Sequence, residues 1–249
     1  MKLAAQTISS EVVDRLNRIL HRGVYASPNE FDVRFLKREL EKLRDADVAF
    51  GWALFGSYNV LLGDLSETER CFSASFRLAS VPAASGNYHA SLCNLGYFNR
   101  AHHYFVEKGR PELGILSHMR DEAASTGSFQ TAVAYSKEAE SMGIALGPEL
   151  NDRYVRAAKV LANAGVSDDD VTRHLDFAGE VLRRHKLFFI NDIQVNVSDV
   201  DGEFIGVTCV LNVRKSPVDA FELNVELAEL EQEMGLQKNP AFDVMFLPL

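Results

Sequence analysis

Seven histidines are the most versatile side chains in this sequence, and two of them, His102 and His103, are adjacent. Imidazoles are common zinc ligands when several converge on one ion. Adjacent residues of a helix point in different directions, so this pair has poor geometry for a shared metal. His89 and His103 could meet His118 across helices, but spacing places no cysteine or carboxylate to join them. The sequence therefore predicts packed or surface histidines and no metal site.

A run of three acids, Asp168-Asp169-Asp170, is the second candidate for metal chemistry. A calcium loop also needs a glycine within the run and a distal glutamate, and neither is present. The run follows Ser167 and is typical of a helix N-terminal cap. The chain also lacks G-x-S-x-G, G-x-G-x-x-G and G-x-x-x-x-G-K-[ST]. We therefore expect no catalytic residue and no cofactor, and a protein that is not an enzyme.

The cysteines and the apolar segments indicate the cellular compartment in which we expect the protein. The three cysteines are far apart, which indicates neither disulfides nor a zinc site and favours a reducing compartment. No apolar run approaches the ~20 residues of a membrane helix. The start of the chain lacks the apolar core of a secretory signal, so we expect a cytoplasmic protein without membrane contact.

The net charge of −9 is concentrated at one end of the chain. Residues 187–249 contain eleven acidic and three basic side chains. An acidic module repels phosphate backbones, so we expect no nucleic-acid partner and favour basic or apolar ones. The asymmetry also indicates a change of module near residue 187.

Amphipathic helices are expected over the first two thirds of the chain, and they must position the histidines and the Asp168-Asp169-Asp170 run. Apolar residues recur at three- and four-residue spacing after a serine at position 9 or 10 and after Ser27-Pro28-Asn29-Glu30, which reads as a capping box. Further helices are expected over about 47–62, 66–80, 86–107, 111–126, 128–143, 148–164 and 168–186. Their pairing is open, because Gly127 can mark either a break between pairs or the turn inside one.

The clearest pattern in this region is Trp52-x2-Phe55-Gly56-x2-Asn59-x3-Gly63-x-Leu65-x6-Phe72. Leu92-x2-Leu95-Gly96 repeats its start forty residues later, and Gly127-x-Phe129-x2-Ala132-x6-Ala139 resembles its turn and second helix. Residues 47–143 therefore resemble a tetratricopeptide-type (TPR-like) array. The resemblance implies stacked antiparallel helical hairpins, with Trp52 and Phe72 filling the space between helices and glycines allowing close approach.

The resemblance also implies a concave groove that holds a peptide or helix of a partner protein. The family's groove positions fall on these residues: Phe50, Ala53, Ser57 and Val60 in the first unit, and Ala90, Cys93, Tyr97 and Arg100 in the second. This groove is apolar with one cation, which favours an apolar or helical ligand. The alternative is that these side chains only pack between repeats.

After residue 187 the apolar period changes to two. A β-hairpin over about 193–213, a helix over about 217–234 and a strand over about 242–247 are expected. With the helix from Asp168 the order is αββαβ, so the fold class is α+β. We predict two domains, a TPR-like helical array over 1–165 and a small α+β domain over 166–249.

The helix near the C-terminus has two apolar stripes separated by acids. A helix on a sheet needs only one such face. We expect the stripe of Leu223, Leu227, Leu230 and Met234 to dock onto the array or onto a second copy, as a possible homodimer. The leading functional hypothesis is a non-enzymatic interaction adaptor. The alternatives are a small-ligand sensor or enzyme that uses the α+β domain, or an RNA-binding module, although the basic GXXG loop of KH domains is missing.

Overall fold

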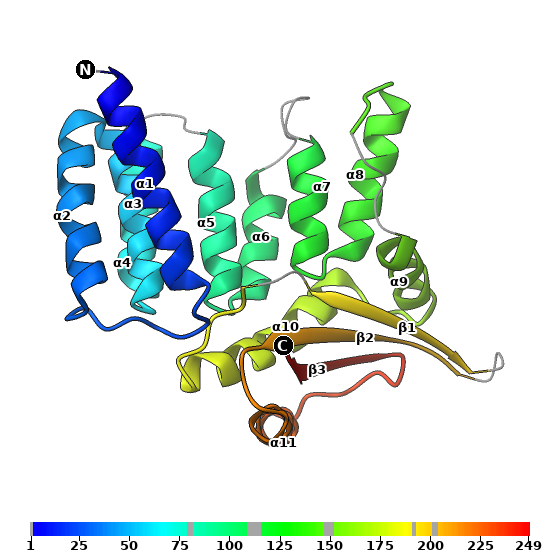
Figure 1. The fold of residues 1–249 in the computed structure, drawn as a ribbon. Coiled ribbons are helices and arrows are strands. Elements are labelled where there is room, and N and C mark those ends of the chain that lie inside the picture. Colours follow the sequence, from blue (N-terminus) through cyan, green and yellow to red (C-terminus); the bar gives the residue numbers. More distant parts are fainter. Residues whose placement is uncertain (1, 79–81, 109–115, 147–151, 191–192, 201–203) are drawn as a thin grey trace. The chain divides into compact units, whose positions relative to one another are not determined.

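A computed structural model describes residues 2–78, 82–108, 116–146, 152–190, 193–200 and 204–249 of the chain (Figure 1). These residues form eleven helices and one three-stranded sheet, and all three strands follow residue 193. The predicted α+β class is confirmed, as is the order helix, β-hairpin, helix, strand at the end of the chain. The TPR-like stacking stays a prediction.

The chain divides into two compact units. Unit 1 contains Met1–Leu95 and Leu182–Ile190, and unit 2 contains Gly96–Val181 and Asn191–Leu249. The units are therefore interleaved in the sequence, because the short segment 182–190 belongs with the first 95 residues. The predicted boundary between residues 165 and 166 separates a purely helical region from one that also contains strands. It was not a prediction of compact units, and it stays a prediction.

Unit 1 is built around one helix that carries no charge on any side. Its helices are α1 (Lys2–Leu20), α2 (Phe31–Ala46), α3 (Val48–Leu61), α4 (Leu65–Leu78) and α5 (Pro82–Asn94). α3 contains no charged residue, and such a helix is stable only when neighbours cover all its sides. Accordingly, α3 packs against each of the other four helices. Its Leu54, Phe55 and Leu61 lie in one apolar core with Leu16 of α1 and Leu36 of α2.

Two glycines shape the hairpin of α3 and α4. Gly63 turns the chain with a φ of 73°, a left-handed conformation that favours glycine. Gly56 faces the ring of Phe72, and a Cβ there would collide with that ring. Phe72 is fully buried, so it fills the space between the helices as predicted.

Trp52, expected to share that space, is only partly buried. Its ring packs against the core of unit 1 and lies 6.1 Å from that of Phe55. The guanidinium carbons of Arg44 and Arg70 lie 5.3 and 5.1 Å from its ring centre. Trp52 therefore sits at the edge of the core, where cations can contact its face.

The helix predicted over 86–107 is wrong, because the chain forms two helices there. α5 ends at Asn94 and α6 (Phe98–Lys108) begins after a turn at Gly96, whose φ is 73°. Leu92-x2-Leu95-Gly96 matches Trp52-x2-Phe55-Gly56 in sequence, whereas the structure gives Gly96 the backbone conformation of Gly63. The turns at Gly63, Gly96 and Gly127 then recur at intervals of 33 and 31 residues.

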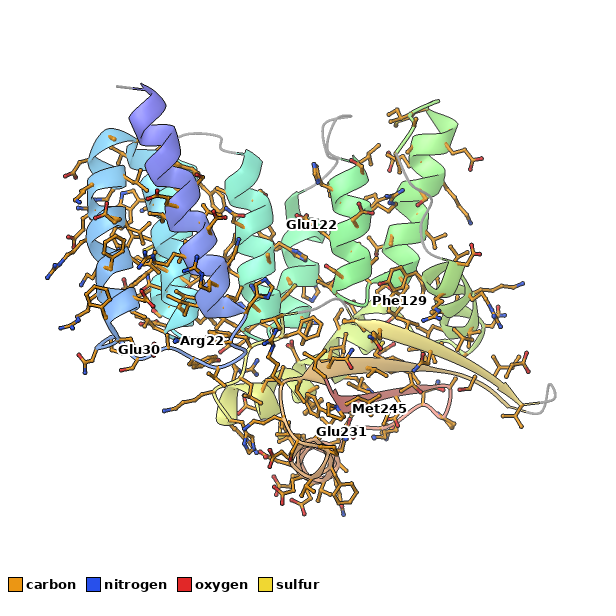
Figure 2. The ribbon with its side chains drawn as sticks, viewed as in Figure 1. Arg22, Glu30, Glu122, Phe129, Glu231 and Met245 are labelled. Atoms are coloured by element: carbon orange, nitrogen blue, oxygen red, sulfur yellow. The ribbon has the colours of Figure 1, made fainter. Side chains whose placement is uncertain are left out.

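Unit 2 continues from α6 with α7 (Leu116–Ser125), α8 (Phe129–Ser141), α9 (Asp152–Asn163) and α10 (Asp168–Arg184), of which residues up to Val181 belong here. α8 packs against both α7 and α9. Gly127 has a φ of 82° and turns the chain between α7 and α8, as Gly63 does between α3 and α4. The pairing of α7 with α8 stays a prediction, because α8 also contacts α9. Phe129, labelled in Figure 2, is fully buried and stacks on Tyr154 at 5.6 Å.

The sheet of unit 2 has the strand order β1-β2-β3. β1 (Gln194–Val200) runs antiparallel to β2 (Phe204–Val213), and β3 (Phe242–Pro248) runs parallel to β2. The parallel pair needs a crossover, which α11 (Pro217–Glu233) supplies. α9 contacts β1 and β2, and α11 contacts β3. Side chains on one sheet face alternate with those on the other, and one face is a buried layer of Val195, Val207, Cys209, Leu211, Val244 and Phe246.

Backbone hydrogen bonds join the segment 182–190 to the rest of unit 1. The amide of Tyr25 donates to the carbonyl of Lys186 at 2.9 Å, and that of Phe188 donates to the carbonyl of Gly23 at 3.0 Å. The rings of Tyr25 and Phe188 lie 4.8 Å apart. Lys186 has a φ of 53° and ends α10 in the left-handed conformation that usually holds glycine.

Candidate functional site

Three helices of unit 1 enclose a small pocket of about 110 Å³. α1, α3 and α5 each contribute one face to it. The lining residues are Leu16, Asn17 and Leu20 of α1, Ser57, Val60 and Leu61 of α3, and Asn87, Ala90, Ser91 and Asn94 of α5. Half of these side chains are apolar and half are uncharged polar groups, so the pocket has no ionisable lining.

Three asparagine amides supply the free polar groups of this pocket. Within the described part of the chain, no hydrogen bond occupies the side chains of Asn17, Asn87 or Asn94. The two hydroxyls are already used by their own helices, because Ser91 donates to the carbonyl of Asn87 at 2.6 Å and Ser57 to that of Ala53 at 3.5 Å. An amide side chain offers both a donor and an acceptor. The pocket can therefore bind a ligand that carries both kinds of group.

The one histidine of α5, His89, adds no charge near the pocket at neutral pH. His89 lies next to the lining residue Ala90 on α5 and is 2% exposed. Burial lowers its pKa to about 3, so the imidazole is neutral. Its Nε2 lies 3.8 Å from the sulfur of Cys93, which is also buried. A charged ligand would find no counter-charge among the lining side chains.

The structure brings together some of the predicted groove residues and separates others. Ser57, Val60 and Ala90 line the pocket. Ala53 is buried against Phe72 and Ala84, which is a packing role. Phe50 is partly buried against the core of unit 1 and does not line the pocket.

Tyr97 and Arg100 belong to unit 2 and line no part of this pocket. Their assignment to the groove assumed one helix over 86–107. The turn at Gly96 breaks that helix, so Tyr97 lies in the turn and Arg100 in the first turn of α6. Arg100 is exposed and Tyr97 is half-buried.

The leucines proposed for docking on α11 face the interior of unit 2. Leu223, Leu227 and Leu230 are 2%, 2% and 6% exposed, whereas Met234, predicted in the same stripe, is 66% exposed. On the same helix, Val218 and Phe221 are each 67% exposed. A partner that approached α11 would therefore meet these two side chains before it met the leucines.

Sequence reasoning missed the asparagines, although a signal was present. Asn87, Ser91 and Asn94 are separated by four and three residues, which places them on one helix face. Asn17 lies on α1, outside the repeat pattern of residues 47–143, and only the fold places it beside them. The predicted helix over 86–107 runs past the true end of α5 at Asn94, so the asparagines did not stand out as one face of a short helix.

In unit 2 the structure brings together three side chains that could hold a metal ion. His102 and His103 of α6 and Asp169 of α10 have ligand atoms that all lie within 4.8 Å of one another. The imidazole rings are 5.4 Å apart, although the residues are adjacent in the helix. Asp169 approaches both histidines, and the spacing of residues in the sequence does not reveal this contact.

Comparison with known proteins gave no relative of this chain: no family model, curated protein or solved structure matches it. The resemblance of residues 47–143 to tetratricopeptide repeats stays a prediction. None of the helices in the described ranges is both long enough and apolar enough to span a membrane.

Proposed function

We propose that the protein is a non-enzymatic adaptor whose unit 1 binds an extended, uncharged peptide segment of a partner protein in the pocket between α1, α3 and α5. One observation carries the proposal, the convergence of Asn17, Asn87 and Asn94 around that pocket. An extended peptide presents unpaired backbone N–H donors and C=O acceptors. Each asparagine amide can satisfy one of each kind.

The size of the pocket favours one side chain of an extended peptide over a helix. Its volume of about 110 Å³ equals that of three to four liquid waters at ~30 Å³ each. A helix with its side chains is about 10–12 Å across and needs a longer groove. The apolar part of the lining, Leu16, Leu20 and Val60, suits an aliphatic side chain. The absence of lining charge disfavours acidic and basic motifs.

A peptide-display experiment on the full chain tests this proposal. We expect selection from a random library to enrich peptides with a shared aliphatic residue and uncharged neighbours. Ala90→Arg places a long cation at the exposed mouth of the pocket and should abolish binding of the enriched peptides. Ser73→Arg is the control, because Ser73 is exposed on α4 and lines no part of the pocket.

Two results would contradict the proposal. One is a library selection that enriches no common peptide. The other is binding that survives Ala90→Arg as well as it survives Ser73→Arg, because the ligand would then bind elsewhere. Circular dichroism of both variants shows whether lost binding reflects a lost fold.

A further inference from the structure

A cluster in unit 2 has the composition of an open metal site. The Nε2 atoms of His102 and His103 lie 3.3 and 3.8 Å from the same oxygen, Oδ1 of Asp169. A tetrahedral ion with bonds of about 2.0–2.2 Å separates its ligand atoms by about 3.4 Å. Both nitrogen–oxygen distances are therefore near the separation that one ion would impose, and all three ligand atoms lie within 4.8 Å of one another. We propose that His102, His103 and Asp169 bind one divalent transition-metal ion of the zinc type.

Hydrogen bonds behind His102 fix which nitrogen faces the site. The hydroxyl of Thr126 donates to the carbonyl of Ala123 at 2.9 Å, so its proton is used within α7. The hydroxyl of Ser128, 3.0 Å from that of Thr126, then acts as the donor between them. Ser128 is left as an acceptor toward Nδ1 of His102, at 2.7 Å. The proton of the neutral imidazole is thereby placed on Nδ1, and Nε2 presents its lone pair.

This arrangement leaves two electron-rich atoms facing each other without a proton between them. The lone pair of His102 Nε2 points toward a carboxylate oxygen that a second imidazole also approaches. Both distances exceed the 2.7–2.9 Å of a charge-assisted hydrogen bond. A divalent cation satisfies all three atoms at once.

The neighbouring acids leave Asp169 available for this role. Asp168 accepts hydrogen bonds from the start of α8, and Asp170 is bonded to Ser167 in the cap of α10. Asp169 alone of the three directs its carboxylate to the histidines. Its side chain and that of His103 are 53% and 47% exposed, so a fourth position is open to water. Two imidazoles, one carboxylate and an open position suit Zn²⁺, Co²⁺ or Ni²⁺ better than Mg²⁺ or Ca²⁺.

Titration of the metal-free full chain with ZnCl₂ and CoCl₂ tests the proposal. We expect one equivalent of either ion to bind, with the intense visible absorption of tetrahedral Co²⁺ and a rise in melting temperature. His103→Ala and Asp169→Asn each remove an exposed ligand and should weaken binding at least tenfold. His118→Ala is the matched control, because His118 is exposed on α7 outside the cluster and should leave binding unchanged.

The variants avoid His102, which is buried and whose loss could unfold unit 2. Absence of saturable binding by the parent chain would overturn the proposal. So would binding that both His103→Ala and Asp169→Asn retain, because the ion would then sit elsewhere. The peptide pocket lies in unit 1, so either outcome leaves the proposed function to its own test.

Discussion

Replacement of Asp168 by alanine should destabilise unit 2 through a helix other than its own. The carboxylate is 7% exposed, and Oδ1 accepts the amide of Gln130 at 3.1 Å. Oδ2 accepts the amide and the hydroxyl of Thr131 at 2.8 and 2.7 Å. These groups belong to the first turn of α8, where helix amides have no partner in the helix itself. A carboxylate there also complements the positive end of the helix dipole.

The magnitude follows from the groups that lose their partner. A hydrogen bond to a charged group contributes ~1.5–3 kcal/mol, and a buried donor left without a partner costs ~1–3 kcal/mol. Gln130 and Thr131 are only half-buried, so water can replace part of the loss. We expect Asp168→Ala to lower the free energy of unfolding by about 2–4 kcal/mol. Asp170→Ala removes an exposed cap within α10 and should cost only about 1 kcal/mol.

Urea unfolding followed by circular dichroism compares the two variants. Fluorescence is unsuitable, because the only tryptophan, Trp52, lies in unit 1. Hydrogen exchange should show faster exchange in the first turn of α8 for Asp168→Ala and at the start of α10 for Asp170→Ala. Equal losses of stability in the two variants, or unchanged exchange in α8, would refute the assigned cap.

Three further predictions test other features. Gly179→Ala places a Cβ against the backbone of Gly96, and we expect a loss of about 1–3 kcal/mol by urea unfolding even though alanine favours helix; Gly165→Ala, where a Cβ meets nothing within 4 Å, isolates the cost of a left-handed φ. Lys186→Gly relieves the positive φ of this residue. We therefore expect the free energy of unfolding to rise by about 0.5–1 kcal/mol and the melting temperature to rise with it. Because the pKa of buried His89 is about 3, against 6.5 for an unperturbed histidine, stability falls as pH drops below about 6.5; His89→Gln should remove about 2 kcal/mol from the difference in unfolding free energy between pH 7 and pH 5.

Local signals in the sequence predicted most elements well. Ser216 and Asp219 form the capping box that opens α11, with Pro217 in its first turn, and the helix was expected within one residue of its observed end. The β-hairpin was expected from the alternating apolar pattern after residue 187, and β1 and β2 form it. These signals work because each depends on residues only a few positions apart.

The misplaced helix shows where local reasoning fails. Leu95-Gly96 resembles Phe55-Gly56 in sequence, yet Gly56 is helical and packs on Phe72, whereas Gly96 turns the chain. A glycine is compatible with both roles, and only its tertiary neighbours decide between them. That single misassignment lengthened one helix and hid the asparagine face of α5. It also placed Tyr97 and Arg100 in a groove that they do not line.

The side chains of α11 show a second limit. Leu223 and Phe221 lie on different apolar stripes, and hydrophobicity alone does not rank them. The structure buries the leucine and leaves the phenylalanine 67% exposed, because β3 contacts only one side of the helix. Which stripe of α11 is buried depends on the position of the sheet. That sheet is built from β1 and β2, which precede α11 in the sequence, and β3, which follows it.

Long-range bonds of α10 explain why the histidine cluster escaped sequence reasoning and why it is firmly held. Asp168 caps α8, and Asp176 accepts the amide of Asn99 at the start of α6 at 3.0 Å. Thr172, one turn from each, accepts a hydrogen bond from the side chain of Asn99 at 3.0 Å. The partners lie 37 to 77 residues away in sequence, beyond any local pattern. Asp169 stands between anchored neighbours on this helix, so its backbone is held in place opposite α6, as the proposed metal site requires of a ligand.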